Sequence, residues 1–409
     1  LAPRREGVDL IIDAILGTGI RGPVQGFLAE VISFINESGR PVLAIDLPSG
    51  LEADTGACPG PVVAATDTIT LDLPKCGLCL YPGAKQAGRL WVAEIGIPPG
   101  APLPEPGVFL TTPRELTCHK AARPPESHKG SWGRVLVVAG SLGMAGAAVL
   151  AARGALRSGA GLVTVASPAG VQPTVAAQLA EAMTYPLPQT PKGSLARAAE
   201  PELLRLLDGA TVLALGPGLG REEETMELVS SLLPRVKVPV VLDADGLTAL
   251  AGRTEVLRRV LGPVVITPHP GEMARLCFLA TREVQENRLG LARQKTAEWQ
   301  VFVALKGARS VIAGPDGRVA INPTGNPGLA TGGTGDVLAG IIAGLLGQGL
   351  PPFTAAVAGV FLHGAAGDLA AGEMGEAGLL AGDVAAYLPA AWQALRRGKD
   401  LLPFLKELP

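Results

Sequence analysis

A glycine-rich segment that leads into an apolar stretch carries the strongest chemical signal in the sequence. Residues 322–340 read NPTGNPGLATGGTGDVLAG, and the turn 332–336 (GGTGD) lies near the start of a predicted helix that begins near Asp336. Glycines let backbone N–H groups converge and a helix N-terminus adds partial positive charge, so this turn is suited to hold a phosphate. Asp336 would stand beside that anion, where a carboxylate accepts a hydroxyl proton or orients a metal-bound phosphate. An N-cap is the alternative role for this aspartate.

Two further loops follow predicted strands and carry residues suited to ligand contact. The loop 216–220 (GPGLG) follows the strand-like run TVLAL, and the segment 267–272 (TPHPGE) follows PVVIT. Loops at the carboxyl ends of parallel strands face the ligand crevice of an α/β sheet. His269 is held between two prolines and is expected to contact substrate, whereas the alternative is a solvated histidine with Glu272 as an acid of the following helix. The glycine loop is equally consistent with a tight strand-to-helix connection.

Charged residues end two more strands at the same predicted edge. Lys306 follows VFVAL and begins the segment 306–310 (KGARS), in which Gly-Ala permits close approach of an adenine or a ribose. Asp243 and Asp245 end another strand in LDADGL, where they either support Mg²⁺ through water or cap the next helix. The small residues of 140–148 (GSLGMAGAA) allow either a bulky ligand or a helix to lie close to the backbone.

The N-terminal part of the sequence holds a second set of oxygen-bearing residues. Asp13 ends one predicted strand just before the segment 17–23 (GTGIRGP), and Asp46 and Ser49 end the next strand. On adjacent parallel strands these side chains are expected to share one edge. There they would supply ligands for a hard cation and a carboxylate for proton transfer. Helix capping is the alternative role.

Short apolar runs separated by helix-like stretches place these residues in an α/β fold. Residues 8–16 and 41–47 are strand-like and enclose a helical pattern at 27–37, which makes one βαβ unit. The segment 96–107 holds five prolines and is expected to be a stiff connector between two domains. Further strand-like runs lie at 67–71, 89–95, 134–139, 161–166, 211–215, 239–243, 263–267 and 301–305, and a hairpin is expected from 310–313 and 318–321. The second domain is therefore predicted to be a mostly parallel, doubly wound sheet.

Length, composition and charge restrict the class of protein. A chain of 409 residues is longer than a single hydrophobic core usually serves, so two domains are expected. Its content of 47% apolar and 18% charged residues suits a compact α/β protein. A net charge of −2 without basic runs argues against a nucleic-acid partner. Five cysteines in so long a chain fit a reducing compartment, so a cytoplasmic location is expected, and the C-x-x-C pair Cys76 and Cys79 lacks a second pair for zinc. Glycines and prolines divide the uncharged stretch 337–367 into two core helices, so no membrane association is expected.

Six stretches of the second domain together resemble the bifunctional NAD(P)H-hydrate repair enzymes, in which an epimerase domain precedes an ADP-dependent dehydratase domain. The resemblance covers nearly the whole chain. It implies a ribokinase-like doubly wound sheet for residues 103–409 and a partial Rossmann-like α/β epimerase domain for residues 1–102. It also implies dehydration of the (6S)-hydrate back to NAD(P)H with consumption of a nucleotide. The matching stretches are 128–141 (HKGSWGRVLVVAGS), 216–220, 242–247, 267–272, 305–310 (LKGARS) and 322–340.

The resemblance also implies roles for single residues of the second domain. Asp336 would be the central catalytic carboxylate. Phosphorylation of the ring hydroxyl makes a good leaving group, and the amide-lined turn stabilises the charge as it moves. The substrates would be NADHX or NADPHX and ADP or ATP with Mg²⁺, and the protein would be a homo-oligomer. The nucleotide would be held by Lys306, Gly307, Ala308, Arg309, Ser310 and Gly335, and the hydrated dinucleotide by Ala147, Gly218, His269 and Asp336.

The first domain resembles the second half of the epimerase. Asp46 would be the catalytic residue that transfers a proton to and from the substrate, and Asp13 and Ser49 would be K⁺ ligands. Residues 1–12 show no counterpart of the family's Asn- and Gly-rich segment that supplies another cation ligand. Epimerisation of the 6R and 6S hydrates is therefore expected of the complete domain. The substrate phosphates would be held by Gly17, Thr18, Gly19, Ile20, Arg21, Gly22 and Pro23.

Two other functions fit parts of the sequence. A ribokinase-like kinase that phosphorylates a vitamin precursor or a sugar would use the same GTGD turn, although the TPHPGE and GPGLG stretches count against it. A binding protein without catalytic activity is the alternative for the first domain.

Overall fold

The chain forms two compact units. A computed structural model describes residues 7–98, 107–117, 123–398, 401 and 405–407. Unit 1 comprises residues 1–110 together with 402–409, and unit 2 comprises residues 111–401. The predicted boundary lay at residues 102 and 103, with all later residues in the second domain. Most of the proline-rich connector lies outside the described residues.

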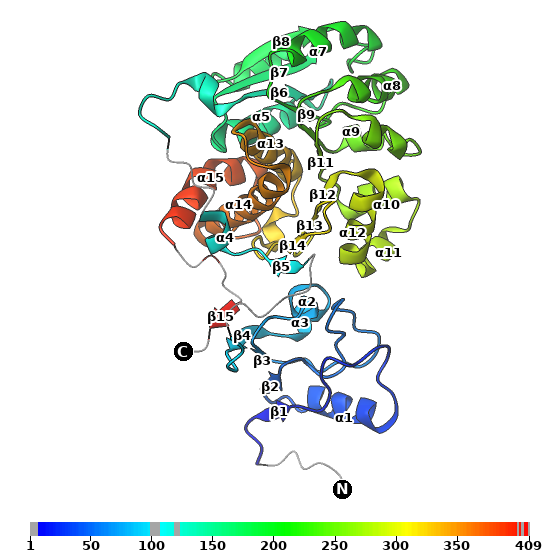
Figure 1. Cartoon of the computed structure of the whole chain (residues 1–409), viewed down its shortest axis with the longest axis vertical. Coiled ribbons are helices and arrows are strands. Elements are labelled where there is room, and N and C mark those ends of the chain that lie inside the picture. Colours follow the sequence, from blue (N-terminus) through cyan, green and yellow to red (C-terminus); the bar gives the residue numbers. More distant parts are fainter. Residues whose placement is uncertain (1–6, 99–106, 118–122, 399–400, 402–404, 408–409) are drawn as a thin grey trace. The chain divides into compact units, whose positions relative to one another are not determined.

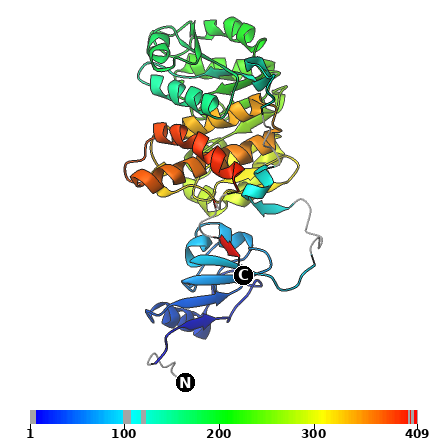
Figure 2. The same ribbon diagram turned by 90° about the vertical axis from the view of Figure 1, so that its left-hand side faces the viewer.

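Unit 1 is a parallel sheet with the strand order β1-β2-β3-β4-β15 (Figures 1 and 2). Helix α1 crosses from β1 to β2, as the predicted βαβ unit requires, and buries Ile32 and Ile35 against Val42 and Val63. The last strand comes from the C-terminal end of the chain, which no sequence pattern indicated. The bounds are β1 Ile11–Asp13, α1 Gly26–Asn36, β2 Val42–Ile45, β3 Asp67–Leu71, α2 Cys76–Cys79, α3 Gly83–Gln86, β4 Arg89–Ala93 and β15 Leu405–Glu407.

The second sheet has the order β5-β14-β13-β12-β11-β10-β9-β6-β7-β8, and its strands β6 to β14 belong to unit 2. The strands from β12 to β8 pair in parallel, and the expected hairpin of β13 and β14 is antiparallel. Strand β8 was not predicted, because Pro186 interrupts its pattern, and its place at the sheet edge explains how a proline is tolerated. The bounds are β5 Val108–Leu110, β6 Arg134–Val138, β7 Leu162–Pro168, β8 Met183–Leu187, β9 Val212–Leu215, β10 Val240–Leu242, β11 Val264–Ile266, β12 Phe302–Leu305, β13 Val311–Ala313 and β14 Val319–Ile321.

Helices cover both faces of this sheet. Figure 1 shows α5 and α13 to α15 on one side and α8 to α12 on the other. Helix α14 is long and apolar enough to span a membrane, but 83% of its apolar window is buried inside the protein, as expected for a core helix. The bounds are α4 Pro113–Thr117, α5 Ala145–Arg157, α6 Gln172–Gln178, α7 Glu200–Leu207, α8 Glu223–Leu232, α9 Asp245–Thr248, α10 Pro270–Cys277, α11 Thr281–Glu286, α12 Arg288–Trp299, α13 Thr334–Gly347, α14 Pro352–Met374 and α15 Ala381–Arg396.

Small residues let α5 and α13 approach backbone to backbone. A Cβ added at Gly340 of α13 would lie 1.9 Å from the Ala151 carbonyl oxygen, and one at Gly154 of α5 would lie 2.3 Å from the Val337 carbonyl oxygen. Larger side chains at these positions would push the helices apart. The close packing fixes the start of α13, and with it the turn 332–336, against the rest of unit 2.

Candidate active site

The carboxyl ends of four adjacent parallel strands bring the predicted residues of unit 2 to one edge. Strands β9, β10, β11 and β12 are neighbours, and they lead into the loop 216–220, Asp243, His269 and Lys306, respectively. This edge is where open α/β sheets place their ligands.

Lys306 is the centre of an ion-pair cluster at this edge. Its Nζ donates to Asp243 Oδ1 at 2.8 Å and lies 3.8 Å from Glu272 Oε2. Both carboxylates are buried. Burial lowers the pKa of Lys306, but the negative charges of Asp243, Glu272 and Asp336 outweigh it and raise the pKa above its ordinary value. The lysine is therefore a fixed cation at neutral pH.

The turn 332–336 approaches this cluster through its glycines. Helix α13 begins at Thr334 with Gly333 as N-cap in the left-handed region, two residues before the start expected from the sequence. A Cβ at Gly333 would lie 2.5 Å from Leu150 Cδ1, and one at Gly335 would lie 3.2 Å from Lys306 Nζ. The free N–H groups of the first helical turn are therefore next to the lysine, as an anion site requires.

Gly332 differs from its neighbours because nothing lies within 4 Å of a Cβ added to it. We expect Gly332→Ala to leave the thermal unfolding temperature unchanged and to lower kcat/KM of the expected nucleotide-dependent reaction about tenfold or more, since only a bound ligand would contact the new methyl group. Parallel melting curves and steady-state kinetics check this, with Gly372→Ala, at an equally open position of α14, as the control. Unchanged kinetics would mean that no ligand comes close to this backbone.

Asp336 has a carboxyl group tuned to exchange protons near neutral pH. Burial, followed by the charge of Asp243, raises its pKa to about 7, although Lys306 opposes the shift. His363 of α14 has a buried ring whose Nε2 lies 2.9 Å from the Thr334 carbonyl oxygen. Burial lowers the pKa of His363 to about 4, so it is a neutral donor that anchors the start of α13.

The raised pKa of Asp336 predicts a pH-dependent stability. Since the folded state holds this proton more tightly than the unfolded chain, the contribution of Asp336 to stability declines as pH rises from about 4 to about 7. The Asp336→Asn variant has no titratable group at this position. We therefore expect the difference in unfolding free energy, variant minus wild type, to be about 2 kcal/mol larger at pH 8 than at pH 5. Urea unfolding at both pH values measures the difference, and a constant difference would contradict the shifted pKa.

His269 lies at the rim of the same edge and caps α10. Its Nδ1 accepts from the Gly271 N–H at 3.0 Å, and Glu272 Oε2 accepts from the His269 N–H at 2.8 Å. Because Nδ1 is the acceptor, a neutral ring carries its proton on Nε2. Nε2 lies 3.5 Å from Glu272 Oε1, and the side chain is 55% exposed, so a ligand can reach the ring. Glu272 lies in the first turn of α10 as the alternative expected, and substrate contact by His269 stays a prediction.

Arg288, a residue that the sequence did not single out, holds the backbone of the segment 306–310 in place. Arg288, the first residue of α12, is buried and donates to the Ala308 carbonyl oxygen. A Cβ at Gly307 would lie 2.5 Å from Arg288 Nη1. Arg309 has a left-handed backbone and donates to the Pro323 carbonyl oxygen at 2.6 Å. No motif signals Arg288, because its role depends on a contact between distant parts of the chain.

Ala147 and Gly218 face each other where the loop 216–220 meets α5. A Cβ at Gly218, which has a positive φ, would lie only 2.8 Å from Ala147 Cβ. The loop also joins the charged edge, because Asp245 Oδ2 accepts from the Gly220 N–H at 3.0 Å and Oδ1 pairs with Arg221 Nε at 3.1 Å. Asp245 therefore fixes this loop, whereas Asp243 faces Lys306.

In unit 1, Asp13 and Ser49 come together as expected. Ser49 Oγ donates to Asp13 Oδ1 at 2.6 Å and the Ser49 N–H donates to Oδ2 at 2.8 Å. Both residues are almost fully buried. Within the described part of the chain, Asp13 accepts only from neutral donors and makes no ion pair, so its negative charge is left for a cation.

Asp46 is held by different partners. It has a left-handed backbone with φ 68°, accepts from the Leu71 N–H at 3.1 Å and pairs with Lys75. Lys75 also donates to the Leu71 carbonyl oxygen at 2.9 Å. The sequence analysis did not single out Lys75. Asp46 thus has a cation beside it, while Asp13 and Ser49 bond to each other.

The loop 17–23 is open to solvent. Its fold requires a positive φ only at Gly22, whose N–H donates to Glu52 Oε1 at 3.0 Å. A Cβ at Gly17 or Gly19 would meet nothing within 4 Å. Packing gives no reason for glycine at those two positions, whereas close approach of a phosphate does. Cys76 and Cys79 form the short helix α2 without a disulfide.

Comparison with known proteins identifies the family. The NAD(P)H-hydrate dehydratase family (Carb_kinase) matches residues 135–390, and the YjeF-related protein N-terminus matches residues 2–77. The bifunctional NAD(P)H-hydrate repair enzyme Nnr of Moorella thermoacetica is 54% identical over 93% of this chain and 72% of its own length. The enzyme of the same name from Escherichia coli is 37% identical over 93% of this chain and 70% of its own length.

A solved structure agrees with the fold of unit 2. The ADP/ATP-dependent NAD(P)H-hydrate dehydratase from Bacillus subtilis, co-crystallised with ATP and Mg²⁺, is 36% identical with a TM-score of 0.62, and the match covers 71% of this chain and 99% of that one. A ribokinase-like superfamily protein from Enterococcus faecalis is 28% identical with a TM-score of 0.60 over 72% of this chain and 99% of its own. The expected ribokinase-like α/β fold is confirmed, and the kinase alternative is less supported than hydrate repair. With a dehydratase domain that follows a YjeF-type N-terminal domain, the chain belongs to the family of bifunctional NAD(P)H-hydrate repair enzymes.

Proposed function

We propose that unit 2 dehydrates (6S)-NAD(P)H hydrate at the turn 332–336 by transferring a phosphoryl group from ADP or ATP to the ring hydroxyl. The hydroxyl oxygen attacks the terminal phosphorus, the bond to the nucleotide breaks, and Asp336 takes the hydroxyl proton. The C–O bond then breaks, the new phosphate leaves the ring, and the adjacent ring carbon loses a proton to solvent, so that the ring regains its double bond. The supporting observation is a carboxyl group with a pKa of about 7 on a helix start that lies against a fixed lysine.

The surrounding residues have distinct roles in this proposal. Lys306 and the segment 306–310, with the amide of Gly335, hold the nucleotide. Ala147, Gly218 and His269 contact the hydrated dinucleotide, since the first two lie where the loop 216–220 meets α5 and the third has a ring that a ligand can reach. The phosphates gain charge during transfer, and the amides at the helix start stabilise that charge.

The carboxylates of this edge fit Mg²⁺ that arrives with the nucleotide. Among the described residues, no three His, Cys, Asp or Glu side chains gather closely enough to hold a metal by themselves. Mg²⁺ usually keeps several waters and binds one or two carboxylates plus substrate phosphates. Asp243 would be one such carboxylate, and Mg²⁺ would neutralise phosphate charge.

An assay with purified NADHX tests this function. We expect the absorbance of the reduced nicotinamide ring to return only with ADP or ATP and Mg²⁺, and one AMP to form per NADH when ADP is supplied. Hydroxymethylpyrimidine and sugars serve as competing substrates for the kinase alternative. Phosphorylation of either without recovery of NADH would reject the proposal.

For unit 1 we propose epimerisation of the 6R and 6S hydrates, with Asp46 as the proton-transfer residue. The loop 17–23 would hold the substrate phosphates, and Asp13 and Ser49 would be part of a K⁺ site. The buried, uncompensated charge of Asp13 fits a cation there. K⁺ would supply positive charge near the phosphates.

Loss of the proton-transfer residue tests the epimerase proposal. In a chain that interconverts the hydrates, Asp46→Asn should stop exchange of solvent deuterium into the ring while hydrate binding persists. Continued exchange would leave a pure binding role. A homo-oligomer and a cytoplasmic location stay predictions from the sequence, and light scattering tests the first.

A further inference from the structure

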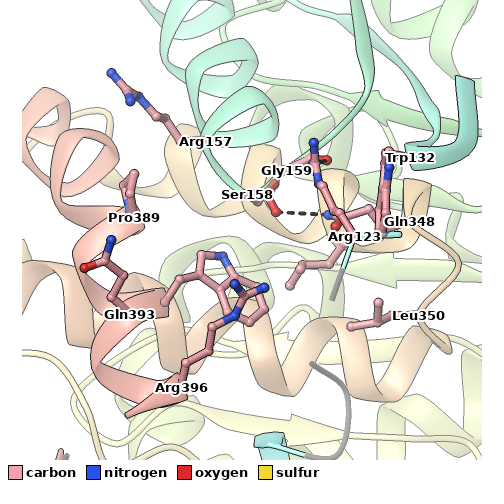
Figure 3. Close-up of a pocket in the computed structure, with 12 residues that line it drawn as sticks. Arg123, Trp132, Arg157, Ser158, Gly159, Gln348, Leu350, Pro389, Gln393 and Arg396 are labelled. Carbon is pink, nitrogen blue, oxygen red and sulfur yellow. Dashed lines mark hydrogen bonds between the residues drawn. The ribbon is translucent and has the colours of Figure 1, made fainter. Parts of the chain in front are cut away.

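A second cavity of unit 2 lies at the end of α13 opposite to the turn 332–336. Its volume is about 420 Å³, within the range of small-molecule sites. Residues at the C-terminal ends of α5, α13 and α15 line it, together with Arg123 and Trp132, which precede β6. Figure 3 shows Arg123, Trp132 and Gln348 on one side and Pro389, Gln393 and Arg396 on the other. It takes no part in the chemistry proposed above.

The lining carries positive charge without a counterion. Arg123, Arg157 and Arg396 are among its twelve lining residues, and none of the twelve is Asp or Glu. Arg157 and Arg396 make no ion pair in the described part of the chain, although the whole protein has a net charge of −2. Arginines near helix C-termini also offset the helix dipoles, Arg157 points away in Figure 3 and Arg123 donates to Gly159, so Arg396 is the arginine placed to bind an anion here.

One side of the cavity is already ordered. The guanidinium of Arg123 stacks 4.6 Å from the centroid of the Trp132 ring, and its Nη2 donates to the Gly159 carbonyl oxygen at 2.6 Å. Gln348 Nε2 donates to the Ser158 carbonyl oxygen at 3.0 Å, the contact drawn in Figure 3. The carbonyl oxygens of Ser158 and Gly159, just after α5, therefore already accept hydrogen bonds, and this side of the cavity is ordered before a ligand binds.

The same cavity offers a surface for a planar ring. Trp132 and Trp392 both line it, and Leu345, Leu350 and Pro389 add apolar area. The buried indole N–H of Trp132 has no acceptor among the described residues. Aromatic faces beside arginines are the combination that binds a base by stacking and its phosphate by charge-assisted hydrogen bonds.

We propose that this cavity is a binding site for a nucleoside monophosphate, with the base against Trp392 and the phosphate on Arg396. Arg396 supplies positive charge for one phosphate, and the cavity volume suits one base with its ribose. Such a ligand lies away from the turn 332–336, so its binding and the dehydration reaction are separate events.

Calorimetric titration of the whole protein with AMP tests the site. AMP can also enter the nucleotide site, so the comparison rests on variants that leave that site intact. Arg396→Gln should weaken one AMP-binding event at least about fivefold. The matched control is Arg397→Gln, because Arg397 is the next residue, is equally exposed and does not line the cavity. We expect it to bind like the wild type.

Two partial ligands separate the contributions of ring and phosphate. Adenosine and ribose 5-phosphate should each bind this site more weakly than AMP, and Arg396→Gln should affect ribose 5-phosphate but not adenosine. Dehydratase turnover without added AMP should be normal in both arginine variants, which reports correct folding. Equal AMP affinities of Arg396→Gln and Arg397→Gln would overturn the proposal, as would adenosine binding as tightly as AMP.

Discussion

Asp336→Asn is expected to lower dehydratase kcat by about 1000-fold or more while it changes the nucleotide Kd by less than a few-fold. The carboxyl group is the proton acceptor, and its pKa of about 7 suits that task at neutral pH. The phosphate is gripped by backbone amides at the start of α13, which the substitution leaves in place. Asparagine has nearly the same shape but cannot take up the proton.

Single-turnover kinetics and equilibrium nucleotide binding measure the two effects separately. Asp368→Asn is a suitable control, because Asp368 bonds to Gly325 and Asn326 in the same glycine-rich segment but is not among the charges that act on Asp336. Turnover of Asp336→Asn within tenfold of the wild type would exclude Asp336 as the proton acceptor.

Lys306→Met is expected to weaken nucleotide binding at least about 100-fold and also to destabilise the fold. The substitution removes the cation that meets the phosphates and leaves Asp243, only 1% exposed, without its partner. Breaking a buried ion pair from one side costs about 3–5 kcal/mol, and the partial exposure of Lys306 favours the lower value. Denaturant unfolding and nucleotide titration measure the two losses.

A double variant distinguishes the two roles of Lys306. In Lys306→Met/Asp243→Asn the buried charge is gone, so most of the stability should return. Nucleotide affinity should stay low, because the lysine that meets the phosphates is still absent. If affinity recovered together with stability, the lysine would be a structural residue and the nucleotide would bind elsewhere.

The sequence predicted residues that end strands or begin helices. His269 and Lys306 each follow an apolar run, and parallel strands bring such ends to one edge, whereas Gly333 and Asp336 precede an apolar run that forms α13. Local pattern therefore sufficed to predict that they would share a site. The exact start of α13 differed by two residues, because Gly333 rather than Asp336 caps it.

Residues whose roles arise from long-range contacts were not predictable in this way. Arg288 lies inside a helical pattern and acts on Ala308 across the fold. Lys75 pairs with Asp46 from a different strand end, and the sequence gives no register between them. Strand β15 joins the sheet of unit 1 from the far end of the chain, a pairing that no local periodicity encodes.

The account depends most on one proposal, that the backbone amides at the start of α13 stabilise the negative charge that develops on the transferred phosphate. A crystal structure with ADP and Mg²⁺ tests it most directly. We predict that the terminal phosphate lies within hydrogen-bond distance of the amides of residues 333–335 and beside Lys306. Phosphate groups bound away from residues 332–336 would contradict the account.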